Sequence, residues 1–159
     1  AVIGIIVATF IFARSNKIET FLLLDLISMS APIGIFLGRI TNFINSELYG
    51  RETNFIWSVK FLKVDEISRH PSQIYEAIFE GIVLFLLLNF VFKKYLYKTP
   101  GIISALFLIF YSFFRFFIEF TREPDIQIGY VLLNLTLGQV LSFLFLLFGL
   151  FLFYKKNET

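Results

Sequence analysis

The sequence predicts an all-α polytopic membrane protein with about five transmembrane helices, the first of them truncated. Of its 159 residues, 57% are hydrophobic, whereas soluble domains are usually about 45–50% apolar. The mean hydropathy is +0.78. Apolar runs close to the roughly 20 residues that a spanning helix needs alternate with short polar turns. We therefore interpret residues 1–159 as a single transmembrane domain, which carries one long polar segment and loop at residues 39–73.

Composition excludes several classes of function. The net charge is only +2, so no nucleic-acid partner is predicted. The chain has no Cys, which excludes disulfides, a thiolate metal site and a Cys nucleophile of its own. A single His and scattered acidic residues argue against a zinc site.

The first two apolar runs differ in length. Residues 1–13 are too few to span a membrane, so we expect them to be the C-terminal part of a helix. A basic turn at residues 14–17 precedes the second span, which is expected from residue 21 to about residue 37. Asp25 shares a face of this span with Ser28 and Pro32. It is either part of a polar face or an interfacial residue that hydrates or caps the helix start.

A polar stretch follows the second span, at residues 38–51. It contains two arginines, two asparagines, a glutamate and two glycines, namely Gly38, Arg39, Asn42, Asn45, Glu47, Gly50 and Arg51. Such a cluster beside an apolar segment is costly unless it pairs internally, meets water or binds a ligand. Arginine offers a planar fork of donors suited to phosphate. The alternative is a hydrated loop whose arginines touch lipid headgroups.

The third span is expected to start near His70 and to run to about residue 92. Pro71 favours a helix start, and Ser72, Glu76 and Glu80 then share one face. Both glutamates either face the protein or stay hydrated in the first turns, where the helix dipole favours them. His70 is either a ligand-binding residue or a capping, interfacial histidine. The preceding loop has too weak an alternation to predict strands.

The fourth span is expected at residues 102–120, after a basic turn at residues 93–101. One face of it carries Ser104, Tyr111, Arg115, Glu119 and Arg122. Arg115 and Glu119 are four residues apart and can pair, either at a site or as a structural pair between helices. A turn at residues 122–125 leads to the last span, expected at residues 130–154. Its polar or small packing positions are Asn134, Thr136, Gly138, Gln139 and Ser142.

The charges suggest an orientation. One side of the membrane receives Arg14, Lys17, Lys93, Lys94, Lys98, Lys155 and Lys156, and the other receives Arg39, Arg51, Lys60, Lys63, Arg69, Arg115 and Arg122. The two counts are equal, so the positive-inside rule does not decide by number. The first group lies in short loops with few acids, which favours the cytoplasm. We therefore expect the second group to form a site at the periplasmic face.

Three motifs resemble those of the bacterial prolipoprotein diacylglyceryl transferases. Residues 38–51 are similar to the family signature G-R-x-x-N-F-I-N-x-E-x-x-G-R, and residues 69–76 read R-H-P-S-Q-I-Y-E. The third motif places Arg115 and Glu119 ahead of R-E-P-D at residues 122–125. The resemblance covers the whole chain, which corresponds to about the C-terminal three-fifths of the family. The His-Gly-Gly motif that the family has upstream is absent, so we expect residues 1–159 alone to be inactive.

The resemblance implies a transferase of the bacterial inner membrane with its active site toward the periplasm. Its reaction moves the diacylglyceryl group of phosphatidylglycerol to the lipobox cysteine of a prolipoprotein signal peptide and releases glycerol phosphate. The partners implied are these two substrates and membrane lipids, with no cofactor and no metal. Carried over by motif, the catalytic residues are Arg39, Arg115 and Glu119. The substrate-binding residues are Asn42, Asn45, Glu47, Gly50, Arg51, His70 and Arg122.

An alternative from another class is a transporter or channel subunit that uses the same polar face as a solute path. Transporters often show internal repeats and helices broken at mid-membrane. We find no repeat, and the charges gather toward one end of the predicted spans. A purely structural membrane subunit is a third possibility.

Overall fold

The computed structural model describes residues 2–124, 129–132 and 134–158. The helices are α1 (Val2–Ser15), α2 (Thr20–Asn45), α3 (Ser72–Glu76), α4 (Leu84–Tyr95), α5 (Ile102–Ile118) and α6 (Leu137–Asn157). A π-helical segment, Ala77–Val83, joins α3 to α4, and a 3₁₀ turn, Glu119–Thr121, extends α5. The short strands are β1 (Val59–Lys60), β2 (Ser68–Arg69), β3 (Tyr130–Leu132) and β4 (Leu135–Thr136). Asp125, part of the predicted turn, lies outside the described residues.

Within these described residues, four helical stretches are long and apolar enough to cross a membrane. They are Thr20–Asn45, Ser72–Phe92, Ile102–Thr121 and Leu137–Asn157, and α1 is apolar but shorter. The prediction of an all-α polytopic membrane protein is therefore confirmed. The strands form only two small antiparallel ladders, β1 with β2 and β3 with β4.

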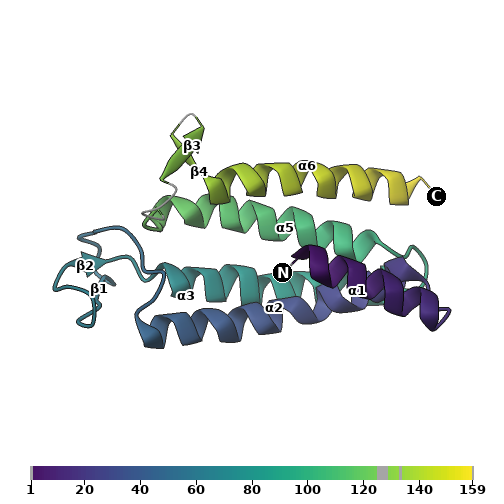
Figure 1. Cartoon of the computed structure of the whole chain (residues 1–159), viewed down its shortest axis with the longest axis horizontal. Coiled ribbons are helices and arrows are strands. Elements are labelled where there is room, and N and C mark those ends of the chain that lie inside the picture. Colours follow the sequence, from purple (N-terminus) through teal and green to yellow (C-terminus); the bar gives the residue numbers. More distant parts are fainter. Residues whose placement is uncertain (1, 125–128, 133, 159) are drawn as a thin grey trace.

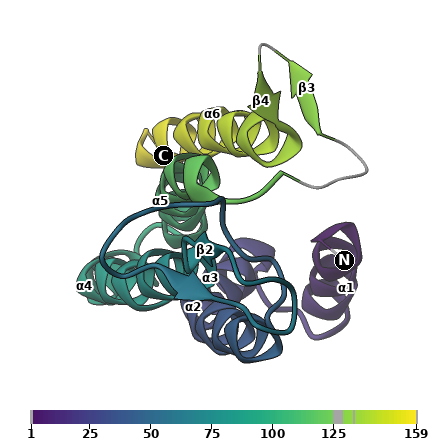
Figure 2. The same ribbon diagram turned by 90° about the vertical axis from the view of Figure 1, so that its left-hand side faces the viewer.

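The helices lie side by side along the long axis of the molecule (Figure 1). Seen end-on, α6 packs on α5, which in turn lies over α2 and the α3–α4 helix, while α1 stands at the edge beside α2 (Figure 2). Both strand pairs lie toward the same end of the bundle, at the left in Figure 1. We call this the loop end. The opposite end holds the start of α5 and the C-terminal end of α6.

Helix α2 continues well beyond the predicted end near residue 37. Pro32 is buried inside the helix, and the helix continues past this proline. The helix ends at Ser46, whose φ of 61° lies in the left-handed region, and the N–H groups of Ser46 and Glu47 close the last turn. Arg39 is therefore a helical residue, and the first half of the polar stretch is not a loop.

Helix α6 starts later than predicted. Residues 130–132 and 135–136, assigned above to the last span, instead form the β3–β4 pair, and Asn134 has a φ of 60°. Thr136 then caps α6: its hydroxyl accepts from the Gln139 N–H, and the Gln139 side chain accepts from the Thr136 N–H. This reciprocal cap determines where the helix begins.

Asp25 is fully buried and caps a different helix from its own. Its carboxylate accepts hydrogen bonds from the Gly101 N–H at 2.7 Å, the Ser104 N–H at 2.8 Å and the Ser104 hydroxyl at 2.6 Å. These donors stand at the start of α5, whose first N–H groups have no partner within the helix. The alternative of an interfacial cap for its own helix is therefore wrong, because Asp25 is buried and caps α5 instead. The contact joins α2 to α5 at the end opposite the loop end.

The apolar core lies between α2, α4 and α5. Its buried members are Leu84, Leu88, Leu96 and Ile103. Between this core and the loop end, charged side chains are buried inside the bundle beside apolar ones.

Candidate functional site

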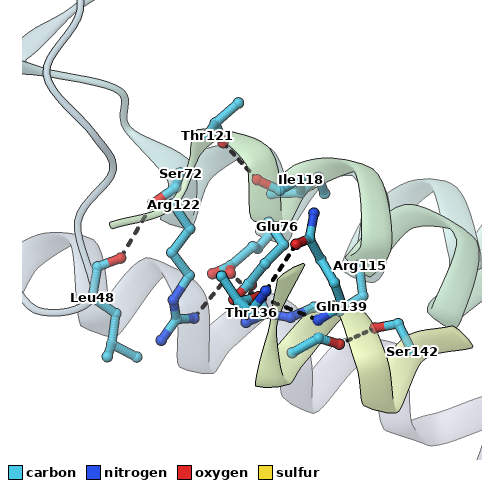
Figure 3. A network of polar contacts seen from close by, with 12 residues as sticks. Leu48, Ser72, Glu76, Arg115, Ile118, Thr121, Arg122, Thr136, Gln139 and Ser142 are labelled. Carbon is cyan, nitrogen blue, oxygen red and sulfur yellow. Dashed lines mark hydrogen bonds and ion pairs between the residues drawn. The ribbon is translucent and has the colours of Figure 1, made fainter. Parts of the chain in front are cut away.

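Six charged side chains meet inside the bundle near the loop end. They are Arg39 from α2, Glu76 from α3, Glu80 from the π-helical segment, Arg115 from α5, and Glu119 and Arg122 just after α5. We call them the charged cluster. Figure 3 shows Glu76 with Arg115 and Arg122 close to the start of α6. Residues more than 80 positions apart in the sequence therefore share one site.

Glu76 is the centre of the charged cluster. Its carboxylate lies 3.2 Å from Arg39 Nε and 3.2 Å from Arg122 Nη1, and it also pairs with Arg115 Nη1. The Glu76 side chain is fully buried. One carboxylate thus contacts three guanidinium groups, one from α2 and two from α5 and the turn that follows it.

The two other carboxylates are bound unequally. Glu119 lies 2.8 Å from Arg115 Nη2 and accepts a hydrogen bond from the Thr136 hydroxyl. Glu80 is fully buried, yet it approaches Arg39 and Arg115 only to 3.7 and 3.6 Å. Among the residues that the structure describes, neither Glu80 oxygen has a hydrogen-bond partner. A buried polar group without a hydrogen-bond partner is uncommon in proteins, so its presence in this part of the bundle requires an explanation.

Formal charges in the cluster cancel, because three arginines face three glutamates. The arginine side chains keep 18%, 13% and 10% exposure at Arg39, Arg115 and Arg122. A guanidinium has five N–H donors, and the contacts above use only some of them. The cluster can therefore offer further donors to an anion while its carboxylates keep the arginines in place. Arg39 is the most accessible of the three.

Both glutamates face inward, Glu76 at the end of α3 and Glu80 in the π-helical segment that follows. Ser72, Glu76 and Glu80 are all fully buried, so the predicted shared face is confirmed and the hydrated alternative is wrong. π-Helical turns are rare and often occur at functional sites. Glu76 and Glu80 were therefore placed on the right face from sequence, but their part in the cluster was missed. The i, i+4 spacing of two acids in an apolar span was the signal.

Gly50 lies where three segments cross beside the charged cluster. It forms an isolated bridge with Arg122, and its N–H donates to the His70 carbonyl at 3.0 Å. A Cβ at this position would lie 2.6 Å from the Thr121 carbonyl oxygen. Only glycine fits, so the crossing requires it. Arg51 continues the junction, because its Nε donates to the Arg122 carbonyl at 2.8 Å.

Arg69 fastens the loop between α2 and α3. It binds Asp65 at 2.7 Å, approaches Glu123 at 3.4 Å and lies over the ring of Tyr49. The hydrogen bond from Arg69 lowers the pKa of the Asp65 carboxyl below its usual range. Phe61 is buried under the same loop and contacts the ring of Tyr49. The segment between α2 and α3 is thus folded and packs over this end of the bundle.

Three predicted binding residues line the end of α2 rather than the charged cluster. Asn42 is half-buried one turn beyond Arg39, whereas Asn45 and Glu47 are exposed. Their side chains make no hydrogen bond within the described part of the chain. The Glu47 carbonyl accepts from the Gln73 side chain at 2.7 Å and so ties the end of α2 to α3. These three polar side chains border the cluster without joining it.

His70 lies in an aromatic group apart from the charged cluster. Its ring is 5.3 Å from that of Phe55, and its Nδ1 lies 3.2 Å from the Tyr75 hydroxyl. The Tyr75 hydroxyl also accepts from Trp57 Nε1 at 2.6 Å, and Trp57 stacks on Phe55. Burial lowers the pKa of His70 below its usual range. The His70 side chain therefore lies in the aromatic group of the loop and not among the side chains of the charged cluster.

The comparison with known protein families identifies the chain. The model of the prolipoprotein diacylglyceryl transferase family matches residues 1–155. The chain belongs to this family. A Rickettsia akari protein is 51% identical over 156 residues, which cover 98% of this chain and 60% of that protein. A Rickettsia bellii relative is 52% identical, with 98% and 59% covered, and a Rickettsia typhi relative is 51% identical, with 99% and 61% covered.

All three relatives are named phosphatidylglycerol–prolipoprotein diacylglyceryl transferase. The chain spans about 60% of the length of these curated relatives. Nothing in these matches supports the transporter or channel alternative. The prolipoprotein diacylglyceryl transferase resemblance drawn from the three sequence motifs is confirmed.

Proposed function

We propose that the protein transfers the diacylglyceryl group of phosphatidylglycerol to the lipobox cysteine thiol of a prolipoprotein signal peptide. The thiol sulfur forms a bond to a glyceryl carbon, and the bond from that carbon to the phosphate oxygen breaks. Glycerol phosphate leaves, and the thiol proton goes to a base. The observation that carries this proposal is the charged cluster, which places three arginines inside a membrane-spanning bundle of this family.

The cluster suits an anionic phospholipid because its arginines lie at one end of the spans. A lipid whose tails stay in the bilayer brings its phosphate to that level. Arginine can hold two phosphate oxygens at once, and fixed cations stabilise the charge that develops on the leaving phosphate. Arg39 and Arg115 flank the buried pair Glu76 and Glu80, so their positions are set before the lipid arrives.

In this proposal Arg39 and Arg115 bind the phosphate, and Glu119 orients Arg115. Arg122 pairs with Glu76 and forms a backbone bridge with Gly50. It supports the side of the site that Arg39 and Arg115 form. Asn42, Asn45 and Glu47 border the headgroup region, and Arg51 and His70 contribute through the folded loop. A nearby cation also lowers the pKa of a thiol, which favours the thiolate that attacks.

The direct test measures transfer of labelled diacylglycerol from phosphatidylglycerol to a lipobox peptide by the purified full-length protein. We expect a labelled thioether product and one equivalent of glycerol phosphate. A peptide with Ser in place of the lipobox Cys is the control and should remain unlabelled. Absence of product with the Cys peptide, in protein that is folded and reconstituted, would reject the proposed activity.

We further propose that the loop end faces the periplasm of a bacterial inner membrane. The short basic turns at the opposite end support this orientation through the positive-inside rule. Cysteines introduced at Lys60 and Lys94 test it, since the chain has no Cys. An impermeant thiol reagent applied to spheroplasts should label Lys60→Cys and spare Lys94→Cys. Labelling in the reverse pattern would overturn the orientation.

A further inference from the structure

We infer that the start of α6 is part of the site, with Thr136 and Gly138 acting as positioning residues for Glu119 and through it for Arg115. This inference rests on the proposed function, because it assigns these residues to the same reaction. From sequence they were only packing positions. The structure instead places them against a carboxylate of the charged cluster.

Thr136 makes two hydrogen bonds with opposite roles. Its hydroxyl donates to Glu119 Oε1 at 2.9 Å and accepts from the Gln139 N–H at 3.3 Å. A hydroxyl has one donor and two acceptor sites, so both bonds can form together. The cap of α6 therefore orients the Thr136 proton toward Glu119. Thr136 is only 4% exposed, so water cannot readily replace its hydroxyl as a hydrogen-bond donor to Glu119.

Gly138 lets the helix start approach Glu119 closely. A Cβ at this position would lie 2.7 Å from Glu119 Oε1 and 2.9 Å from Glu119 Cδ. Real Cβ atoms do not tolerate such contacts, so any larger residue would displace the carboxylate. The start of α6 and the Glu119 carboxylate are thus fitted to one another, and the positive end of the helix dipole faces a negative charge.

Glu119, positioned by α6, in turn positions Arg115. Its Oε1 atom faces Thr136, and its Oε2 atom lies 2.8 Å from Arg115 Nη2. Arg115 also pairs through Nη1 with Glu76. The guanidinium is therefore held on two sides, by α3 and by the Glu119–Thr136 contact. Loss of the Thr136 hydroxyl would remove the hydrogen bond that orients Glu119, and so loosen its hold on Arg115, without changing any charge.

Four variants of the full-length protein in lipid nanodiscs separate this role from simple helix capping. Thr136→Val keeps the shape and loses the hydroxyl, whereas Thr136→Ser keeps both hydrogen bonds. Gln139→Ala removes the reciprocal half of the cap and leaves the Thr136 hydroxyl in place. Gly138→Ala pushes on Glu119. Its matched control is Gly149→Ala, where an added Cβ would meet α5 at 3.0 Å, far along the helix from Glu119.

We expect Thr136→Val and Gly138→Ala to lower kcat for diacylglyceryl transfer about tenfold or more, with KM for phosphatidylglycerol little changed. This size follows from the strength of one hydrogen bond to a charged group. Thr136→Ser should restore kcat to within about twofold of wild type. Gln139→Ala and Gly149→Ala should lower the melting temperature but keep kcat per folded molecule. Equal loss of kcat in all of these variants would mean that only helix stability matters and would overturn the inference.

A second readout does not depend on transfer. With ¹⁵N-labelled arginine, the Arg115 guanidinium signals, assigned by their loss in Arg115→Lys, report whether the group is held. They should broaden or shift in Thr136→Val and Gly138→Ala, and remain as in wild type in Thr136→Ser and Gln139→Ala. If wild type shows no transfer, the proposed function fails, and these signals still decide the positioning role. Unchanged Arg115 signals in Thr136→Val would reject it.

Discussion

Buried carboxylates occur at both ends of the helix bundle, and they are satisfied in opposite ways. Asp25, at the end opposite the loops, accepts three hydrogen bonds between 2.6 and 2.8 Å from uncharged donors. Glu80, near the loop end, has no hydrogen bond among the described residues and meets two arginines at 3.6 and 3.7 Å. Both side chains are fully buried.

We interpret the difference as one between a structural contact and the proposed site. A buried charge that is fully hydrogen-bonded rigidifies the elements it joins, and Asp25 joins α2 to α5 in this way. Buried charges that remain partly unsatisfied are costly and persist where they serve a ligand. Hydrogen bonds thus hold the bundle at one end, and the unsatisfied carboxylate at the other end supports the proposed site. Four predictions test this contrast, from the largest expected effect to the smallest.

Replacing Arg39 or Arg115 by Lys should nearly abolish transfer while leaving the protein inserted and folded. Lysine keeps the charge but lacks the planar fork that holds two phosphate oxygens. We expect each variant to lose about 3–4 kcal/mol of transition-state stabilisation, or roughly two to three decades in single-turnover rate. Expression level and melting temperature in detergent are the controls. Near-normal transfer by both variants would return these arginines to a purely structural role.

Glu76→Gln should destabilise the bundle more than any other single change at the loop end. The variant leaves three arginines, which are mostly shielded from water, facing two glutamates. Removing one partner of a buried ion pair costs about 3 kcal/mol or more of unfolding free energy. Unfolding in detergent with increasing denaturant measures the loss. Glu66→Gln, at an exposed position of the loop, is the matched control and should change little. Wild-type stability in Glu76→Gln would show that the arginines need no central carboxylate.

Asp25→Asn should lower stability without affecting the chemistry. The amide keeps the shape of the side chain but turns one acceptor into a donor that faces the Gly101 and Ser104 N–H groups. We expect a loss of about 2 kcal/mol of unfolding free energy, the size of hydrogen bonds to a charged group. Transfer per folded molecule should stay close to wild type, because Asp25 lies at the other end of the bundle. A loss of transfer without a loss of stability would contradict the division between the two ends.

Acid should loosen the aromatic group around His70 before it affects either end of the bundle. Burial lowers the pKa of His70 below its ordinary value of 6.5. Its folded-state pKa is therefore below the unfolded one, so this contribution to stability is complete above pH 6.5 and declines as the pH falls through the folded-state pKa. Trp57 is the single tryptophan of these residues, and its fluorescence reports the change. His70→Gln should remove the pH dependence, and a titration that persists in this variant would assign it to another group.

The sequence by itself determined the membrane class and the faces of the charged residues, but not where every span begins and ends. Apolar length and helical period are local properties, so the membrane class, the shared face of Glu76 and Glu80, and the Arg115–Glu119 pair could all be read from spacing. The Pro, Gly and polar residues of α2 misled the prediction of its end, because a helix packed among others tolerates them. The three motifs sufficed to find the family.

Only the tertiary structure decided which of these residues meet. Asp25 binds Gly101, 76 positions away, and Arg39 joins Glu76 only because α2 and α3 pack side by side. The start of α6 moved to Leu137 because Thr136 caps it and at the same time contacts Glu119. Such contacts depend on the packing of segments that are distant in sequence, and they produce no periodic pattern in the sequence. Spacing places a side chain on a face, and packing determines what that face touches.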